Sequence, residues 1–177
     1  MQGKFDMMRQ FLDSTCQVME CYNVCNLMRF FLSVNTKNWD EAKNYYKLLD
    51  RNTAILWSAN LYWAYVLKKT GNPLEADSIA RNDLSRSEKE VGRRNGRTFY
   101  RLSQIHAFLN QKEKALQYLR EYEGLELAFS FYDYILIDPL YENLRDDPEF
   151  LEIVDRAQKE KQDIKEQVKQ LVQEGLL

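Results

Sequence analysis

The chain has 177 residues, of which 45% are hydrophobic and 13% are aromatic. That composition can build a sizeable core and excludes an intrinsically disordered chain. The formal net charge is −2, with acidic and basic residues interspersed, which excludes a global electrostatic attraction to nucleic acid or to an anionic membrane. The length predicts one domain or one continuous array.

The start of the chain, MQGKFDMMRQFLDSTCQ, lacks the basic start, apolar stretch and cleavage site of a signal peptide. No apolar run approaches the ~20 residues of a membrane span. We therefore expect a cytoplasmic protein without a membrane span. That expectation is weaker if the sequence is a piece of a longer chain.

The cysteines Cys16, Cys21 and Cys25 share one apolar helical stretch. A disulfide framework usually has an even number of scattered cysteines in a small secreted chain. The spacing C-x4-C-x3-C is not a zinc spacing, and no second ligand pair follows it. We expect buried free thiols in a reducing compartment.

Helical apolar spacing dominates the segments between glycine and proline breaks, and strand signals are poor. The fold is therefore predicted to be all-α. A uniformly apolar helix is expected over 18–34, and further helices over 38–49, 72–84 and 111–122. Each of the last three helices has an alanine about one turn after its start. These alanines are Ala42, Ala76 and Ala115, and they lie 34 and then 39 residues apart.

The segment 125–150 ends in two Asp-Pro pairs, at 138–139 and 147–148. Asp147 is predicted to be the N-cap of a long helix that has Pro148 at its first position and runs to about Glu174. The apolar stripe of this helix has alternating spacings of four and three, is interrupted by Lys161, and consists of Phe150, Val154, Ala157, Ile164, Val168 and Leu171. Two interpretations stay open: a capping helix with a solvated far end, or a helix–helix contact with a second copy or another protein.

The 34-residue period and the alanine pattern resemble the tetratricopeptide repeat family, here in the form of a bacterial-type array with a degenerate terminal repeat. That family carries W-x2-L-G-x2-Y on the first helix of each repeat and A-x3-F on the second. The third repeat matches best, through Phe99, Leu102, Ser103, His106, Ala115 and Leu119. The second repeat matches through Trp63, Ala64, Leu67, Ala76 and Ala80, with Asn60 where a large residue is usual, and the first through Ala42 and Tyr46.

The resemblance implies a right-handed α-solenoid of stacked antiparallel helix pairs with a long C-terminal capping helix. The implied parts are repeat 1 at 17–51, repeat 2 at 54–90, repeat 3 at 96–123, a degenerate repeat 4 at 125–155 and an extension at 156–177. The register of the first helix stays open. Small residues let neighbouring helices approach, so stacked pairs share one continuous core.

His106 is the only histidine of the chain. Nucleophilic catalysis needs a base beside the nucleophile, and the sequence has no G-x-S-x-G and no glycine-rich phosphate loop. We therefore expect no enzymatic activity, no cofactor and no metal site. The resemblance places His106 where the family usually has a large aromatic residue, so we expect it to pack between two helices.

Ligands of this family usually lie along the concave face that the first helices of the repeats line. Carried over to this sequence, that face is predicted to hold Tyr62, Tyr65 and Lys69 from repeat 2, and Arg97, Tyr100, Arg101, Gln104 and Phe108 from repeat 3, with Ser58 and Leu61 in the wider set. Tyrosine and arginine are enriched at binding hot spots. The alternative is that these tyrosines pack against the N-terminal helix or a second copy.

Arg97 and Arg101 stand one turn apart, as basic residues do in the carboxylate clamp of chaperone-binding members of the family. The rest of that clamp does not match, because Tyr62 replaces its asparagine and its first-repeat residues fall on apolar positions such as Leu27 and Phe31. Three interpretations stay open: a clamp, a solvated basic rim with Arg93 and Arg94, or a site for another acidic partner.

The function predicted from the sequence is a non-catalytic scaffold that binds a peptide or partner protein in a concave aromatic and basic groove. The first alternative is a regulatory or effector-sensing C-terminal part of a larger bacterial signalling or transcription protein. The second is a homodimerisation module that uses residues 18–34 or 150–171.

Overall fold

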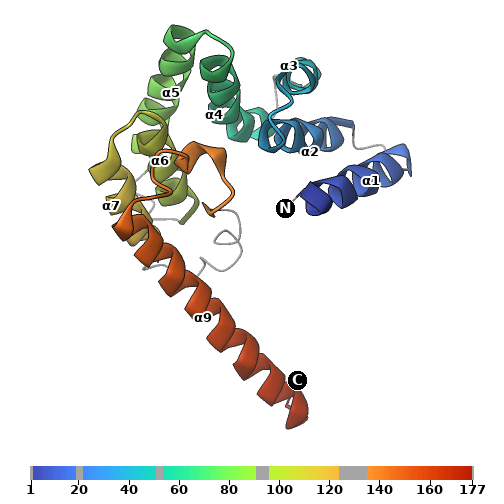
Figure 1. Ribbon diagram of the computed structural model, residues 1–177, viewed down its shortest axis with the longest axis vertical. Helices are drawn as coiled ribbons and strands as arrows, with labels where there is room; N and C mark the ends of the chain where they lie inside the picture. Colours follow the sequence, from blue (N-terminus) through green and yellow to red (C-terminus); the bar gives the residue numbers. More distant parts are fainter. Residues whose placement is uncertain (1, 19–21, 51–53, 91–95, 124–134, 177) are drawn as a thin grey trace. The chain divides into compact units, whose positions relative to one another are not determined.

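A computed structural model describes residues 2–18, 22–50, 54–90, 96–123 and 135–176 (Figure 1). All regular structure in these ranges is helical, which confirms the predicted all-α class. The elements are α1 (Gln2–Val18), α2 (Tyr22–Asn35), α3 (Trp39–Lys47), α4 (Ala54–Lys69), α5 (Pro73–Glu88), α6 (Gly96–Phe108), α7 (Lys112–Glu123), the 3-10 helix η3 (Pro139–Tyr141) and α9 (Pro148–Gln173). None of the described helices is both long and apolar enough to cross a membrane.

The chain forms two compact units, Met1–Ser85 and Arg86–Leu177. In the first unit α1 and α2 lie side by side, α3 packs on α2, and α4 packs on both α2 and α3 (Figure 1). Aromatic side chains join α3 to α4. The ring of Tyr46 stacks on Trp63 with centroids 4.3 Å apart, and its hydroxyl donates a 2.9 Å hydrogen bond to Asn60. A polar residue is thus accommodated at position 60, where the repeat pattern has a large one.

The structure corrects the sequence analysis at the N-terminal end. The apolar helix expected over 18–34 is α2, and the preceding helix α1 was not predicted. A disulfide joins Cys16 of α1 to Cys25 of α2, so the prediction of free thiols is wrong for these two residues, while Cys21 lies outside the described ranges.

The error has a geometric cause. Along one continuous helix, residues nine apart are separated by roughly 13 Å, too far for a disulfide. Because α1 and α2 pair as a hairpin, the Cα atoms of Cys16 and Cys25 are instead 5.9 Å apart. Disulfides persist mainly in oxidising compartments, so this pairing also argues against the reducing environment that we expected for these thiols.

Three helix-to-helix turns repeat the same backbone geometry. Each has one residue with positive φ, Lys37 at 58°, Gly71 at 91° and Asn110 at 58°. In each turn the next backbone N–H bonds a carbonyl five residues back, as in a Schellman motif. These bonds run from Asn38 to Ser33 (2.9 Å), from Asn72 to Leu67 (2.9 Å) and from Gln111 to His106 (2.8 Å). The turns recur at the 34- and 39-residue offsets of the sequence period.

The repeated turn places the three pattern alanines at equivalent points of the following helices. Ala42, Ala76 and Ala115 are each completely buried. Ala64 and Ser103, the small residues expected on the first helices, are also completely buried. The predicted burial of these small residues is therefore confirmed, while the stacking of helix pairs that they would allow stays a prediction.

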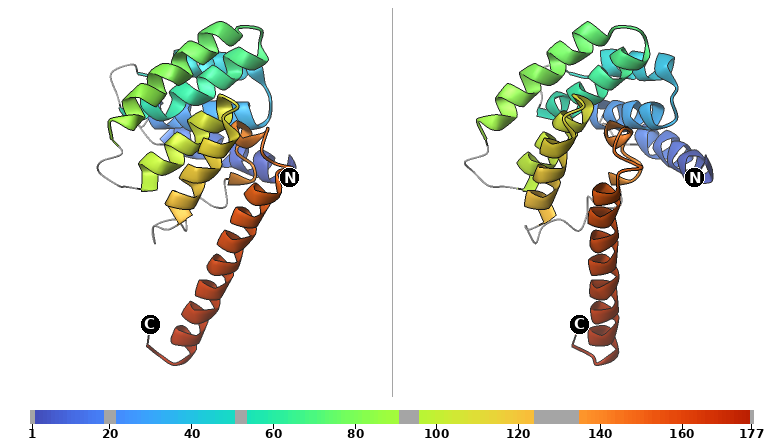
Figure 2. Two further views of the ribbon diagram at one scale, coloured as in Figure 1. Left: turned by 90° about the vertical axis from the view of Figure 1, so that its left-hand side faces the viewer. Right: turned by 60° about the vertical axis from the view of Figure 1, so that its left-hand side comes forward.

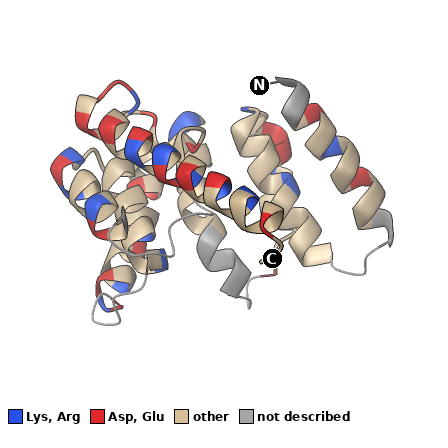
Figure 3. Cartoon of the chain, turned by 90° about the horizontal axis from the view of Figure 1, so that it is seen from below, with Lys and Arg blue, Asp and Glu red and all other residues tan. Residues whose placement is uncertain are grey.

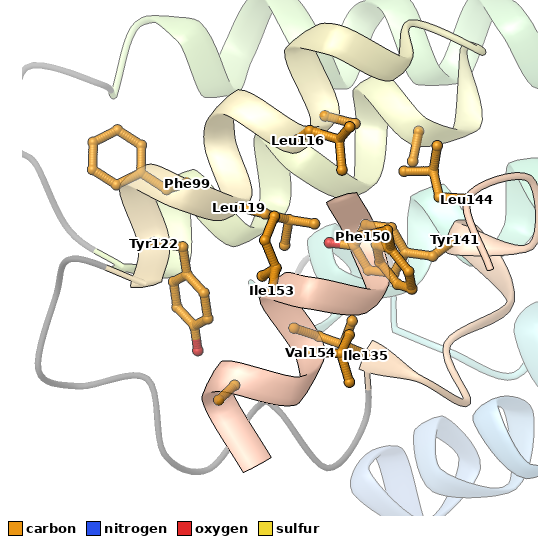
Figure 4. Packing of buried hydrophobic residues seen from close by; sticks show 13 residues of the cluster. Phe99, Leu116, Leu119, Tyr122, Ile135, Tyr141, Leu144, Phe150, Ile153 and Val154 are labelled. Carbon is orange, nitrogen blue, oxygen red and sulfur yellow. The ribbon is translucent and has the colours of Figure 1, made fainter. Parts of the chain in front are cut away.

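In the second unit α7 packs on α6 and on α9, while η3 packs on α6. The core of this unit is one cluster of buried side chains from all four elements and from the segments before and after η3 (Figure 4). Its members are Phe99, Ala107, Ala115, Leu116, Leu119, Tyr122, Ile135, Tyr141, Leu144, Phe150, Ile153, Val154 and Ala157. The part of the degenerate fourth repeat predicted over 125–134 lies outside the described ranges.

The predicted start of the last helix is confirmed. The side chain of Asp147 accepts hydrogen bonds from the backbone N–H groups of Glu149 (3.0 Å) and Phe150 (3.2 Å), and Pro148 is the first helical residue. Lys112 of α7 pairs with the same carboxylate, and this hydrogen bond is the main reason that the pKa of Asp147 is lowered. The helix ends at Gln173, one residue before the expected end.

Candidate functional site

His106 lies in the packing between α6 and α7. Its ring stacks on Tyr118 with centroids 5.3 Å apart, and its Nδ1 lies 2.6 Å from the side-chain oxygen of Gln111. Because an amide oxygen only accepts, Nδ1 is the donor in this hydrogen bond. Burial lowers the pKa of His106. The prediction that this histidine is a packing residue is confirmed.

In the first unit, the predicted groove residues make contacts within the unit. Tyr65 is buried and meets Trp39 of α3 edge-on, with centroids 6.0 Å apart. The ammonium group of Lys69 lies 5.2 Å from the centre of the Tyr65 ring, and Tyr62 packs edge-on against Phe31 of α2 at 4.9 Å. Tyr62 is half-buried and Lys69 is exposed.

In the second unit, the prediction of an exposed inner face on α6 is wrong for three residues. Arg101, Gln104 and Phe108 are only 6%, 3% and 5% exposed. Tyr100 is half-buried, and Arg97 is exposed. Arg97 and Arg101 therefore do not present two accessible guanidinium groups, as a carboxylate clamp or a solvated basic rim would require.

The chain supplies its own carboxylate to α6. One oxygen of Asp138, Oδ2, accepts hydrogen bonds from the Tyr100 hydroxyl at 3.0 Å and from the Gln104 amide at 2.6 Å. The other oxygen accepts from the backbone N–H of Leu140 at 3.0 Å, which caps η3. Asp138 is 4% exposed, and these protein donors replace the water that a buried carboxylate has lost.

A second polar contact lies beside the first. The hydroxyls of Ser103 and Tyr141 are hydrogen-bonded to each other. The pKa of Tyr141 is raised well above its usual value, first by burial and second by the charge of Asp138. Arg145 adds a guanidinium group that donates to the backbone carbonyls of Ile137 and Asp138. Together these bonds hold the segment around η3 against α6, so two predicted groove residues serve intramolecular packing.

A small polar cavity in the first unit lies among α1, α2 and α3. It is lined by Arg9, Leu12, Asp13, Arg29, Leu32, Ser33, Glu41 and Tyr45 and has a volume of about 20 Å³. Arg9 pairs with Glu41 and Arg29 with Asp13, both at 3.0 Å. The hydrogen bond from Arg9 is the main reason that the pKa of Glu41 is lowered. A cavity of this size holds about one water molecule, whereas ligand pockets are many times larger.

Six large hydrophobic side chains are exposed on α1 and α2, and two of them are Met7 and Tyr22. Met8 and Phe11 of α1 are 40% and 64% exposed, and Val24 and Met28 of α2 are 43% and 38% exposed. Phe11 directly precedes the buried Leu12. On α2, Val24 precedes Cys25, which forms the disulfide with α1, and Met28 precedes Arg29, which pairs with Asp13 of α1. In an antiparallel helix pair, positions just before the contact positions lie on the same side. We call Met8, Phe11, Val24 and Met28 the α1–α2 apolar face.

This face could not be predicted from the sequence, because no helix is expected over residues 2–17. The only signal was the run of methionine and phenylalanine between Met7 and Phe11, within a segment considered only as a possible leader. Among the described residues, no group of three or more histidine, cysteine or carboxylate side chains is placed to hold a metal ion. Comparison of the chain with protein-family models, with curated proteins and with solved structures finds no match.

Proposed function

We propose that the chain is a non-catalytic protein-interaction module that binds a partner protein on the α1–α2 apolar face. Soluble monomers rarely expose a contiguous group of large apolar side chains, and such groups commonly mark interaction sites. The exposure of Phe11, at 64%, is the observation that carries the proposal. Methionine side chains adapt to different partner surfaces, which suits Met8 and Met28 to this role.

The scaffold of the module is proposed to be an array like that of tetratricopeptide repeats. The recurrence of one turn geometry at Lys37, Gly71 and Asn110 supports a repeated helix–turn–helix unit. The buried alanines that follow each turn support the same interpretation. Stacked helices would hold the exposed side chains in fixed positions, so that little ordering entropy is lost on binding.

The proposed surface differs from the groove predicted from the sequence. Tyr100 and Gln104 already donate hydrogen bonds to Asp138, and Arg101 and Phe108 are buried. A partner would have to displace the segment around η3 to reach Tyr100 and Gln104. Binding to the α1–α2 apolar face requires no such displacement.

The experiment compares the proteins that co-purify with the wild-type chain, with Phe11→Glu and with Leu74→Glu. Leu74 is the matched control, because it is an exposed hydrophobic residue on another helix of the same unit, 87% accessible. We expect partners to be lost from Phe11→Glu and kept by Leu74→Glu. Identical partner lists from all three proteins would retire the proposed face.

A third variant separates the two surfaces. Lys69→Glu/Arg97→Glu reverses the charge of the two exposed residues of the predicted groove and substitutes none of its buried members. Loss of partners from this variant alone would restore the groove as the binding surface. Substitution of Tyr65 or Arg101 is less informative, because both side chains are buried and their loss would also lower stability.

A further inference from the structure

One apolar seam runs along the whole of α9, but its two halves differ in what covers them. In the first half, Phe150, Val154 and Ala157 are buried in the core of the second unit. In the second half, the same seam continues through Ile164, Val168 and Leu171. Val168 is 45% exposed and Leu171 is 38% exposed. The views of Figures 1 and 2 agree that this half extends beyond α6 and α7 of its own unit.

The seam has the seven-residue repeat of a coiled coil. Spacings of four and three alternate from Phe150 to Leu171 when Lys161 is counted as a seam position. In heptad notation the d positions are Phe150, Ala157, Ile164 and Leu171, and the a positions are Val154, Lys161 and Val168. A straight helix would drift by about 20° per heptad away from such a seam, so a strict seven-residue repeat indicates a supercoiled partner helix.

We propose that the distal part of α9, residues 161–173, pairs with the same segment of a second copy of this chain as a parallel two-stranded coiled coil. Val168 at a with Leu171 at d favours two parallel strands, whereas Ile164 at the other d position of this segment is more typical of three- and four-stranded coiled coils. A single lysine at an a position, here Lys161, specifies register and oligomeric state at some cost in stability. Val168 with Leu171, together with Lys161, fits a dimer of identical helices.

The charges beside the seam favour the parallel arrangement. In a parallel pair, a g residue meets the e residue five positions later on the other helix. Glu160 occupies g and Lys165 occupies e, so each Glu160 would meet Lys165 of the partner subunit. Figure 3 shows acidic and basic residues following one another along the helix that ends at the C-terminus.

An antiparallel pair that uses the same a and d residues would bring like charges together at the flanking positions. Its e positions would place Lys165 opposite Lys165 of the partner subunit, and its g positions would place Glu160 opposite Glu174 of the partner subunit. Like charges at such flanking positions suppress a pairing mode. A parallel pair brings together one like-charged pair, Lys161 and Lys161 of the partner subunit, but it gains two Glu160–Lys165 pairs of opposite charge. The charge pattern therefore favours a second copy in the parallel orientation.

The helix is already formed before a second copy arrives. Asp147 caps its first turn, and its first half packs on α7. Helix nucleation, the unfavourable step for a short isolated coiled coil, is therefore complete. The dimer surface shares no residue with the α1–α2 apolar face, so failure of one proposal leaves the other standing.

The test measures the molar mass of the full chain against concentration by sedimentation equilibrium, for wild type, Val168→Glu and Gln170→Glu. Gln170 is the matched control, because it is exposed on the outer side of the same helix turn. We expect a concentration-dependent dimer for wild type and Gln170→Glu. Val168→Glu, which buries a charge in the seam, should weaken association at least about tenfold. A wild-type monomer at every concentration, or a dimer unaffected by Val168→Glu, would overturn the proposal.

The orientation has its own test. Glu160→Lys and Lys165→Glu should each weaken self-association, and an equimolar mixture should associate again because both flanking pairs regain opposite charges. In a Cys21→Ser background, Val168→Cys should cross-link to itself on oxidation, since a positions face each other in a parallel pair. Preferred cross-linking between Val168→Cys and Ile164→Cys chains would instead show an antiparallel pair and would overturn the parallel model.

Discussion

The amide of Gln104 on α6 donates a 2.6 Å hydrogen bond to the buried carboxylate of Asp138, which lies 34 residues further along the chain. Tyr100, one turn before Gln104, donates to the same oxygen at 3.0 Å. A helix face that was predicted to receive an acidic partner thus receives an acidic side chain of its own chain. This contact connects α6 to the segment that precedes α9, and it explains why Tyr100 and Gln104 are not available to a partner.

The first prediction concerns this carboxylate. Asp138→Ala should lower the free energy of unfolding by roughly 2–4 kcal/mol, because Tyr100, Gln104 and the N–H of Leu140 would lose a charged acceptor in a buried site. Urea unfolding measures the loss, and hydrogen exchange should rise over residues 135–147. Asp146→Ala removes an exposed acid nearby and should change stability little. Equal stability of the two variants would contradict the role assigned to Asp138.

The second prediction concerns the turn between α2 and α3. Lys37 adopts a φ of 58°, a conformation that costs a residue with a side chain about 1 kcal/mol and glycine much less. Lys37→Gly should therefore raise the free energy of unfolding by about 0.5–1 kcal/mol, measured by urea or thermal unfolding. Gly71 already occupies the equivalent position of the next turn.

The control for this turn is a glycine placed inside a helix of the same unit. Asn44 is exposed in the middle of α3. Asn44→Gly should lower the free energy of unfolding by roughly 0.3–1 kcal/mol. Destabilisation by both substitutions would show that the positive φ of Lys37 imposes no cost.

The features that could be predicted from the sequence are those determined by interactions between residues that are close together along the chain. The alanines at 42, 76 and 115 predicted the positions of three helices, because a turn and the helix after it are determined by local backbone geometry. Asp147 followed by Pro148 predicted a helix start for the same reason, since a cap bonds the N–H groups next to it.

The features that could not be predicted depend on contacts between distant residues. The bond between Gln104 and Asp138 spans 34 residues, and neither side chain carries a local signal for the other. The disulfide can be predicted only if α1 and α2 are known to be separate helices that pair, whereas the apolar run over 18–34 predicts a single helix. The burial of Arg101 likewise depends on tertiary packing rather than on helical spacing.

The third prediction concerns the disulfide between α1 and α2. Of the 3 cysteines, two are joined, so one thiol should react with an alkylating reagent in the unfolded, unreduced chain and three after reduction. Reduction should lower the free energy of unfolding by roughly 2–3 kcal/mol, because the link closes a short loop and restricts the unfolded chain. Mass spectrometry counts the alkyl groups. Labelling of all three thiols without reductant would show that Cys16 and Cys25 are not paired.

The fourth prediction follows from the buried imidazole of His106. Burial lowers its pKa in the folded state, whereas the unfolded chain should titrate near the usual value of about 6.5. The unfolded state then binds the proton more readily, so stability is complete above about pH 6.5 and falls as the pH drops towards the folded pKa, by at most about 1.4 kcal/mol per pH unit. Urea unfolding between pH 7 and 5.5 tests this. His106→Tyr, which can keep the stacking on Tyr118, should be at least as stable and lose that part of the acid sensitivity. If His106→Tyr keeps the full acid sensitivity, other groups cause that sensitivity. A large loss of stability in His106→Tyr would contradict the assignment of position 106 to a site for an aromatic side chain.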